Sequence, residues 1–385
     1  MTGFAAYTTL LPVLQREWGL SNSEAGLIGG IYYAGFVAAT PILTSLTDRV
    51  DPRRIYLASC LISFAGAAGF ALFADGLVTA LPFQMLIGIG LGGTYMPGLK
   101  VLTDQLEGNT QARAVGFYTA SFGIGSSLSI VICGAIGASL GWKWAFAYGA
   151  AGPLIAALLV NMLMPPGRTR AAHEQARALF DFRPVLKNRR TLPYILGYST
   201  HNYELFGQRS WMVAFLVFTA SLQPADAPML VGAATLAAII NMLGPVMSVS
   251  GNELAIRFGR TRVIFTFMTA SGLLACVLGY TAVLPWVLVF LIMCLHYGLM
   301  LGDSAALTSG AIASAPPGER GATMAVYSFV GFSSAMLAPL VFGVVLDLAG
   351  GNRSVVAWGL AFASIGIVGA LAPVARWFYR RRFSG

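Results

Sequence analysis

Long, uninterrupted apolar runs constrain this chain more than any other feature of its sequence. Eleven of them reach the length of about 20 mostly apolar residues that a helix needs to cross a bilayer. Their apolar residues are continuous rather than alternating, which excludes a closed β-barrel. With 57% hydrophobic and only 10% charged residues, the chain is too apolar for a soluble enzyme, a disordered protein or a nucleic-acid-binding domain. We therefore expect an all-α membrane protein. The predicted spans are 25–46, 55–74, 78–101, 114–138, 145–164, 191–219, 228–250, 263–282, 286–312, 321–346 and 355–376.

A twelfth apolar run, residues 1–14, is too short to span, because fourteen helical residues rise only ~21 Å against ~30 Å of hydrocarbon. The two halves of the chain resemble each other at an offset near 207, which aligns Phe122 with Phe329. This repeat predicts two six-helix halves related by a pseudo-two-fold axis, with a site at their interface. It also places the start of the first helix roughly 17 residues before Met1. We therefore expect the first helix to be truncated and the natural chain to be longer.

Basic residues divide unevenly between the two sides of the predicted membrane. Of the 24 lysines and arginines, 20 fall on one set of loops and three on the other, while Arg209 lies inside a span. Cytoplasmic loops carry such an excess, so the C-terminus is predicted to be cytoplasmic. The longest polar stretch holds seven of the basic residues and reads as a cytoplasmic linker. The predicted organisation is a transmembrane half at 1–164, the linker at 165–190 and a second transmembrane half at 191–385.

The loop after the second span reads Thr44-Ser45-Leu46-Thr47-Asp48-Arg49-Val50-Asp51-Pro52-Arg53-Arg54. It resembles the loop 2–3 signature of the major facilitator superfamily, although Thr44 and Asp51 replace both glycines of that signature. A degenerate copy at 254–260 and the turn at 141–146 fit the same superfamily. The resemblance implies a secondary transporter that works by alternating access, in which Asp48, Arg49 and Arg53 form a latch. The alternative is that these arginines only set the topology.

Two stretches, 90–100 and 191–219, look most like the cyanate and nitrate/nitrite porters of that superfamily. Nitrate porters carry an arginine in spans 2 and 8, and neither span has one here. We therefore do not expect nitrate itself to be the substrate.

Ionisable side chains inside the spans are candidate functional residues, because each costs at least ~2.5 kcal/mol in the bilayer interior. His201, Glu204 and Gln208 follow i, i+3, i+7 spacing and share one face of the seventh span. Glu204 is predicted to lie about 20 Å deep, where a carboxyl group can load and release a proton. With Arg209 and His296, these residues form the predicted substrate and proton pathway. The alternative is a structural Glu204–Arg209 or His201–Glu204 pair.

Lys100 and Asp303 each follow a proline by 18 residues, Pro82 and Pro285, in repeat-related spans. We predict that the two form a cytoplasmic gate and approach only in the outward-facing state. The alternative is that each charge snorkels to the membrane interface. Pro97 is expected to bend or unwind its helix.

No nucleophile–base set, metal-ligand spacing or Walker loop is present in the sequence. We therefore expect no enzyme activity, no cofactor and no bound metal. The predicted function is secondary active transport of a small solute, coupled to protons, by a multi-pass monomer of the bacterial inner membrane. Its predicted partners are the solute, protons and the lipid bilayer, without nucleic acid. The alternative function is a transporter-like membrane sensor or scaffold without turnover, which solute flux in vesicles would distinguish.

Overall fold

A computed structural model describes residues 1–47, 50–104, 108–163, 183–316 and 319–383. Side chains are described there except at residues 45, 96, 100–117, 119–120, 320–321 and 372–383. All regular elements in this part of the chain are helical, which confirms the predicted all-α class. Within the same part, nine helices are long and apolar enough to cross a membrane. Helix α8 has 30 residues but carries the polar cluster and lies outside that set.

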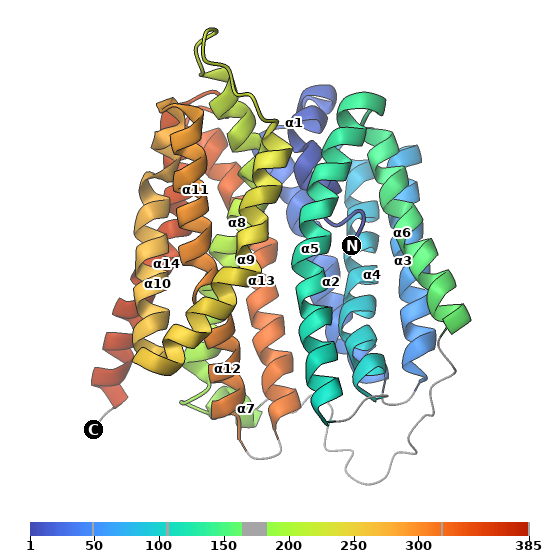
Figure 1. Cartoon of the computed structure of the whole chain (residues 1–385), viewed down its shortest axis with the longest axis vertical. Coiled ribbons are helices and arrows are strands. Elements are labelled where there is room, and N and C mark those ends of the chain that lie inside the picture. The colour runs from blue at the N-terminus through green and yellow to red at the C-terminus, as the bar shows by residue number, and fades with distance from the viewer. Residues whose placement is uncertain (48–49, 105–107, 164–182, 317–318, 384–385) are drawn as a thin grey trace. The chain divides into compact units, whose positions relative to one another are not determined.

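The helices group into two compact units (Figure 1). The N-terminal unit comprises Met1–Leu20 and Ile28–Phe180, and the C-terminal unit comprises Ser21–Leu27 and Asp181–Gly385. The start of α2 therefore belongs to the C-terminal unit, while the rest of that helix belongs to the N-terminal one. Six helices precede residue 164: α1 (Ala6–Trp18), α2 (Asn22–Leu46), α3 (Pro52–Phe73), α4 (Leu77–Asp104), α5 (Gly108–Leu140) and α6 (Trp142–Leu163).

In the N-terminal unit, α3 packs against both α4 and α6 (Figure 1). Asp51 starts α3 by accepting a 2.9 Å hydrogen bond from the Arg53 backbone N–H, and Pro52 occupies the first helical position. The Arg53 guanidinium donates to the backbone oxygen of Asn161 at 2.7 Å and to its side-chain oxygen at 2.9 Å. Arg53 thus ties the start of α3 to the end of α6. Asp48 and Arg49, the other predicted latch residues, lie outside the described residues.

Glycines allow the helix backbones of this unit to approach closely. A Cβ atom on Gly88 of α4 would collide with the carbonyl oxygen of Tyr32 in α2. A Cβ atom on Gly66 of α3 would lie 2.9 Å from the Ile87 backbone nitrogen of α4. Small residues serve helix packing in lipid in this way, because apolar association alone gains little there. Helix α4 runs unbroken through Pro82 and Pro97, so Pro97 does not unwind it, and the alternative prediction of a bend there stays a prediction.

In the C-terminal unit, α8 packs against α13, and α10 packs against α14 (Figure 1). This unit also contains a 3₁₀ turn, Gly279–Val283, between α10 and α11. Its helices are α7 (Arg183–Lys187), α8 (Leu192–Ser221), α9 (Ala233–Phe258), α10 (Arg260–Leu278), α11 (Trp286–Leu301), α12 (Ser304–Ser314), α13 (Arg320–Leu348) and α14 (Val355–Phe383).

The span predicted at 286–312 is two helices, because α11 ends at Leu301 and α12 begins at Ser304. The break falls at Gly302 and Asp303 rather than at a proline. A Cβ atom on Gly251 of α9 would collide with the Gly302 carbonyl, and one on Gly302 would lie 2.6 Å from the Phe267 ring of α10. Close packing from two neighbouring helices thus coincides with the break, and Asp303 is the residue before α12.

Helix α7 lies in the segment predicted to be a linker, and it is docked rather than free. Val185 is fully buried in an apolar cluster with Ile195 and Tyr327. Asn188 and Thr191 donate side-chain hydrogen bonds of 2.9 and 2.7 Å to the Ser314 carbonyl at the end of α12. The last residues of the predicted linker are therefore part of the C-terminal unit.

One carboxylate of α13 caps the first turn of α2, inside the C-terminal unit. Asp347 Oδ1 accepts hydrogen bonds from the backbone and side-chain nitrogens of Asn22 at 3.1 and 2.7 Å. Asp347 Oδ2 accepts from the backbone nitrogen and hydroxyl of Ser23 at 2.7 and 2.6 Å. The first N–H groups of a helix have no partner within it and favour a negative charge, so this carboxylate stabilises the start of α2.

We predict that Gly88→Leu destabilises the protein, because the new side chain has no room beside the Tyr32 carbonyl. Overpacking of this kind costs about 1–3 kcal/mol or more. The melting temperature of the detergent-purified protein should therefore fall by roughly 5 °C or more. Gly76→Leu is the control, since nothing lies within 4 Å of a Cβ atom at that position. Equal melting temperatures for the two variants would contradict the close-packing argument.

Candidate functional site

A stripe of buried polar side chains runs along α8 in the C-terminal unit. His201, Glu204 and Gln208 are 2%, 2% and 0% exposed, and they occupy the shared face predicted from their spacing. Groups of this kind are costly to bury without partners. The role of each of these residues therefore depends on the side chains that pair with it.

Glu204 lies within hydrogen-bonding distance of two residues on two other helices. Its Oε1 atom is 2.9 Å from Nε2 of His296 in α11, and its Oε2 atom accepts a 3.1 Å hydrogen bond from the Ser271 hydroxyl of α10. A Cβ atom on Gly369 of α14 would lie only 2.8 Å from Oε2, so a glycine there leaves room for the carboxylate. Helices α8, α10, α11 and α14 thus enclose one carboxyl group whose partners are a histidine and a hydroxyl.

His201 forms a second pair, with the aspartate at the break between α11 and α12. Its Nδ1 atom lies 2.7 Å from Oδ1 of Asp303, with both side chains almost completely buried. The ring of Tyr198 stacks on the imidazole at 6.0 Å between centroids. Neither a Glu204–Arg209 nor a His201–Glu204 pair forms, because each acid takes a different histidine. The side chain of Lys100 is outside the described part, so the predicted Lys100–Asp303 gate stays a prediction.

Arg209 is bound to a phenol rather than to an acid. Its Nε and Nη2 atoms donate to the Tyr297 hydroxyl at 3.1 and 2.8 Å. The Tyr297 hydroxyl in turn donates to Oδ1 of Asn241 at 2.6 Å. The guanidinium carbon also lies 5.8 Å from the ring centre of Phe206 and 5.9 Å from that of Tyr297, within the range of a cation–π contact.

Gln208 differs from the rest of the stripe. Both of its amide atoms are buried and lack a hydrogen-bond partner among the described residues. Buried amides are normally hydrogen-bonded, and Gln208 departs from that norm.

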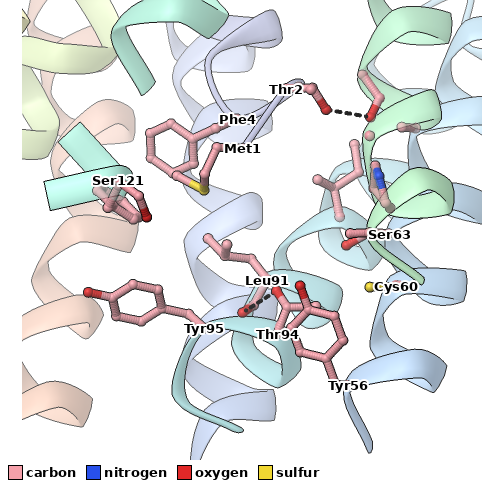
Figure 2. A pocket seen from close by; sticks show the side chains of 18 of the residues that line it. Met1, Thr2, Phe4, Tyr56, Cys60, Ser63, Leu91, Thr94, Tyr95 and Ser121 are labelled. Carbon is pink, nitrogen blue, oxygen red and sulfur yellow. Dashed lines mark hydrogen bonds between the residues drawn. The ribbon is translucent and has the colours of Figure 1, made fainter. Parts of the chain in front are cut away.

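The N-terminal unit contains a cavity of about 240 Å³ with a different character. Figure 2 shows Met1 and Phe4 on one side of this space and Tyr56, Thr94 and Tyr95 on the other. Its described lining is aromatic and hydroxyl-bearing and includes no charged side chain. This cavity can accommodate apolar or neutral parts of a molecule.

Several of these residues escaped prediction from the sequence. Ser271, Asn241 and Tyr297 are neutral polar residues of kinds that occur throughout apolar helices, so nothing in their spacing singles them out. His296 and Asp303 pair with successive turns of α8, at Glu204 and His201. In the described part of the chain, no cluster of His, Cys, Asp and Glu could hold a metal ion.

Comparison with known proteins gives matches over much of the chain. Residues 1–253 match the family model described as Major Facilitator Superfamily. A probable 4-methylmuconolactone transporter of Cupriavidus pinatubonensis is 25% identical over 222 residues, which cover 56% of this chain and 50% of that protein. A probable L-galactonate transporter of Escherichia coli is 24% identical over 400 residues, covering 96% of this chain and 83% of that protein. The crystal structure of the nucleoside transporter NupG superposes with a TM-score of 0.75 at 13% identity, covering 97% of this chain and 93% of that one.

We predict that the His201–Asp303 pair is stabilising only as a pair. Asp303→Leu should lower the free energy of unfolding by about 3–5 kcal/mol, because it leaves His201 buried without its partner. The His201→Leu/Asp303→Leu double variant should recover most of this loss, since apolar residues can replace a buried pair at little cost. The measurement is unfolding of the purified protein in detergent. Asp226→Leu, at an exposed position, is the control. A double variant no more stable than Asp303→Leu alone would show that the pair is not coupled.

Proposed function

We propose that this chain, which belongs to the Major Facilitator Superfamily, is a secondary active transporter that couples a small solute to protons by alternating access. The superfamily is one of transporters rather than enzymes, and the named relatives above are transporters of small solutes. The observation that carries the proton-coupled part is the environment of Glu204.

Glu204 is a buried carboxyl group whose partners do not force it to stay ionised. An adjacent arginine would favour the charged form strongly, but Arg209 is bound to Tyr297 instead. The partners of Glu204 are instead the His296 imidazole and the neutral Ser271 hydroxyl. The site can therefore hold a proton on the acid, or hold an ion pair, without an unpaired charge in either state.

A second titratable pair lies one helical turn from the first. His201 and Glu204 are three residues apart on α8, and each faces its own partner, Asp303 or His296. Two neighbouring acid–histidine pairs offer successive positions for a proton. This arrangement supports a proton pathway through the C-terminal unit better than a single buried acid would.

The solute that we propose is a small organic carboxylate. The relative aligned over 96% of this chain is named for L-galactonate, which is a carboxylate. The likeness of residues 90–100 and 191–219 to cyanate and nitrate/nitrite porters stays a prediction from sequence. We propose a multi-pass monomer of the bacterial inner membrane, and the distribution of its basic residues supports a cytoplasmic C-terminus.

The latch and the gate remain part of the proposal. Arg53 already binds the end of α6, which supports a role in holding the loop between α2 and α3. A gate between Lys100 and Asp303 would require Asp303 to leave His201. The double variant Lys100→Asp/Asp303→Lys should then transport better than either single variant.

We predict that Glu204→Gln lowers proton-driven accumulation in proteoliposomes at least tenfold. Glutamine keeps the shape of the side chain but cannot take up a proton. Solute exchange without a proton gradient should persist, because it needs no net proton movement. Glu253→Gln, at an exposed position of α9, is the control and should accumulate solute normally. Unchanged accumulation in Glu204→Gln would refute the role of this acid, and solute binding without any flux would favour the sensor or scaffold.

A further inference from the structure

We infer that Arg209 binds the carboxylate of the transported solute, and that Tyr297 and Asn241 position it for that purpose. This inference rests on the proposed transport function and assigns the substrate class to a side chain. It begins from the charge of Arg209. Arg209 lies well inside the predicted span 191–219, where an uncompensated charge is expensive.

No acid neutralises this charge in the described part of the chain. Both acids of the buried cluster are already engaged, Glu204 with His296 and Ser271, and Asp303 with His201. The partner of Arg209 is the neutral Tyr297 hydroxyl. A guanidinium group stays protonated at any physiological pH, so it cannot relieve the cost by losing its proton. An anion from outside the chain can relieve it.

The hydrogen bonds among Arg209, Tyr297 and Asn241 determine which group donates and which accepts. The single proton of the Tyr297 hydroxyl goes to Asn241, so the oxygen can only accept from Arg209. Tyr297 and Asn241 are buried, which holds the acceptor in place. Two of the five guanidinium N–H groups are used in this way, and three remain to donate to a ligand.

The side chain is also accessible. Arg209 is partly exposed, while its neighbours Gln208 and Ser210 are buried. A guanidinium with free parallel donors matches a carboxylate in a bidentate arrangement. A single cation neutralises a single negative charge, so the geometry favours a monocarboxylate over a phosphate ester with two charges.

The test is equilibrium binding to the purified protein in detergent, without a proton gradient. The probes are a panel of monocarboxylates of increasing size, including benzoate and L-galactonate, each paired with its neutral amide. We expect at least one acid to bind in preference to its amide. Arg209→Gln should weaken that binding by about 10- to 100-fold, the range for a lost hydrogen bond to a charged group. Arg353→Gln removes an exposed positive charge and should bind normally.

Tyr297→Phe tests whether the Tyr297 hydroxyl positions Arg209 for binding or only supports the packing of the helices. It removes the acceptor and should weaken binding of the acid without changing the weaker binding of the amide, which a general packing defect would also alter. Equal binding of acids and amides, or acid binding that persists in Arg209→Gln, would overturn the inference and leave Arg209 as a structural cation–π contact. Binding is also separable from proton coupling, because the binding measurement uses no proton gradient. Arg209-dependent binding together with normal accumulation by Glu204→Gln would refute only the proton proposal.

Discussion

A charged group removed from water needs a partner, either another ionisable group or a set of dipoles, and the C-terminal unit provides both kinds within a few turns of α8. Glu204 and Asp303 each lie against a histidine. Arg209 cannot lose its charge and relies on the Tyr297 hydroxyl and on two aromatic rings. These partners bring α8 against its neighbours: His296 and Tyr297 lie on α11, and Asp303 lies at the break between α11 and α12.

The fold was largely predictable from the sequence, because the length of an apolar run states directly whether a helix can cross the membrane. The break at Gly302 and Asp303 was not predictable, since it depends on how α9 and α10 approach that point. Pro97 misled for the same reason: a proline in a membrane helix can be accommodated within the continuous helix, as α4 shows. Local sequence is therefore a weak indicator of helix breaks, because neighbouring helices determine the path of the backbone.

The sequence identified residues of the candidate site, but it did not indicate which of them pair with each other. Spacing along one helix places His201 and Glu204 on one face, and the same reasoning applies to His296 and Asp303. Which residue of one face meets which residue of another depends on the antiparallel alignment and relative height of two helices, which spacing does not encode. The neutral partners Ser271, Asn241 and Tyr297 carry no sequence signal, because single hydroxyls and amides are common in membrane helices.

The glycines that let helices touch also determine how this protein tolerates mutation. Any single-base change that replaces a glycine introduces a larger residue or a stop. At Gly88, Gly251 and Gly302, even one added carbon meets backbone or a ring at less than contact distance. Large side chains such as Leu163 and Leu348 are mostly exposed on the helices and have room to vary. The positions that tolerate substitution least are thus these glycines. A screen for loss of function should therefore recover substitutions at these glycines more often than at the bulky leucines of the outer surface.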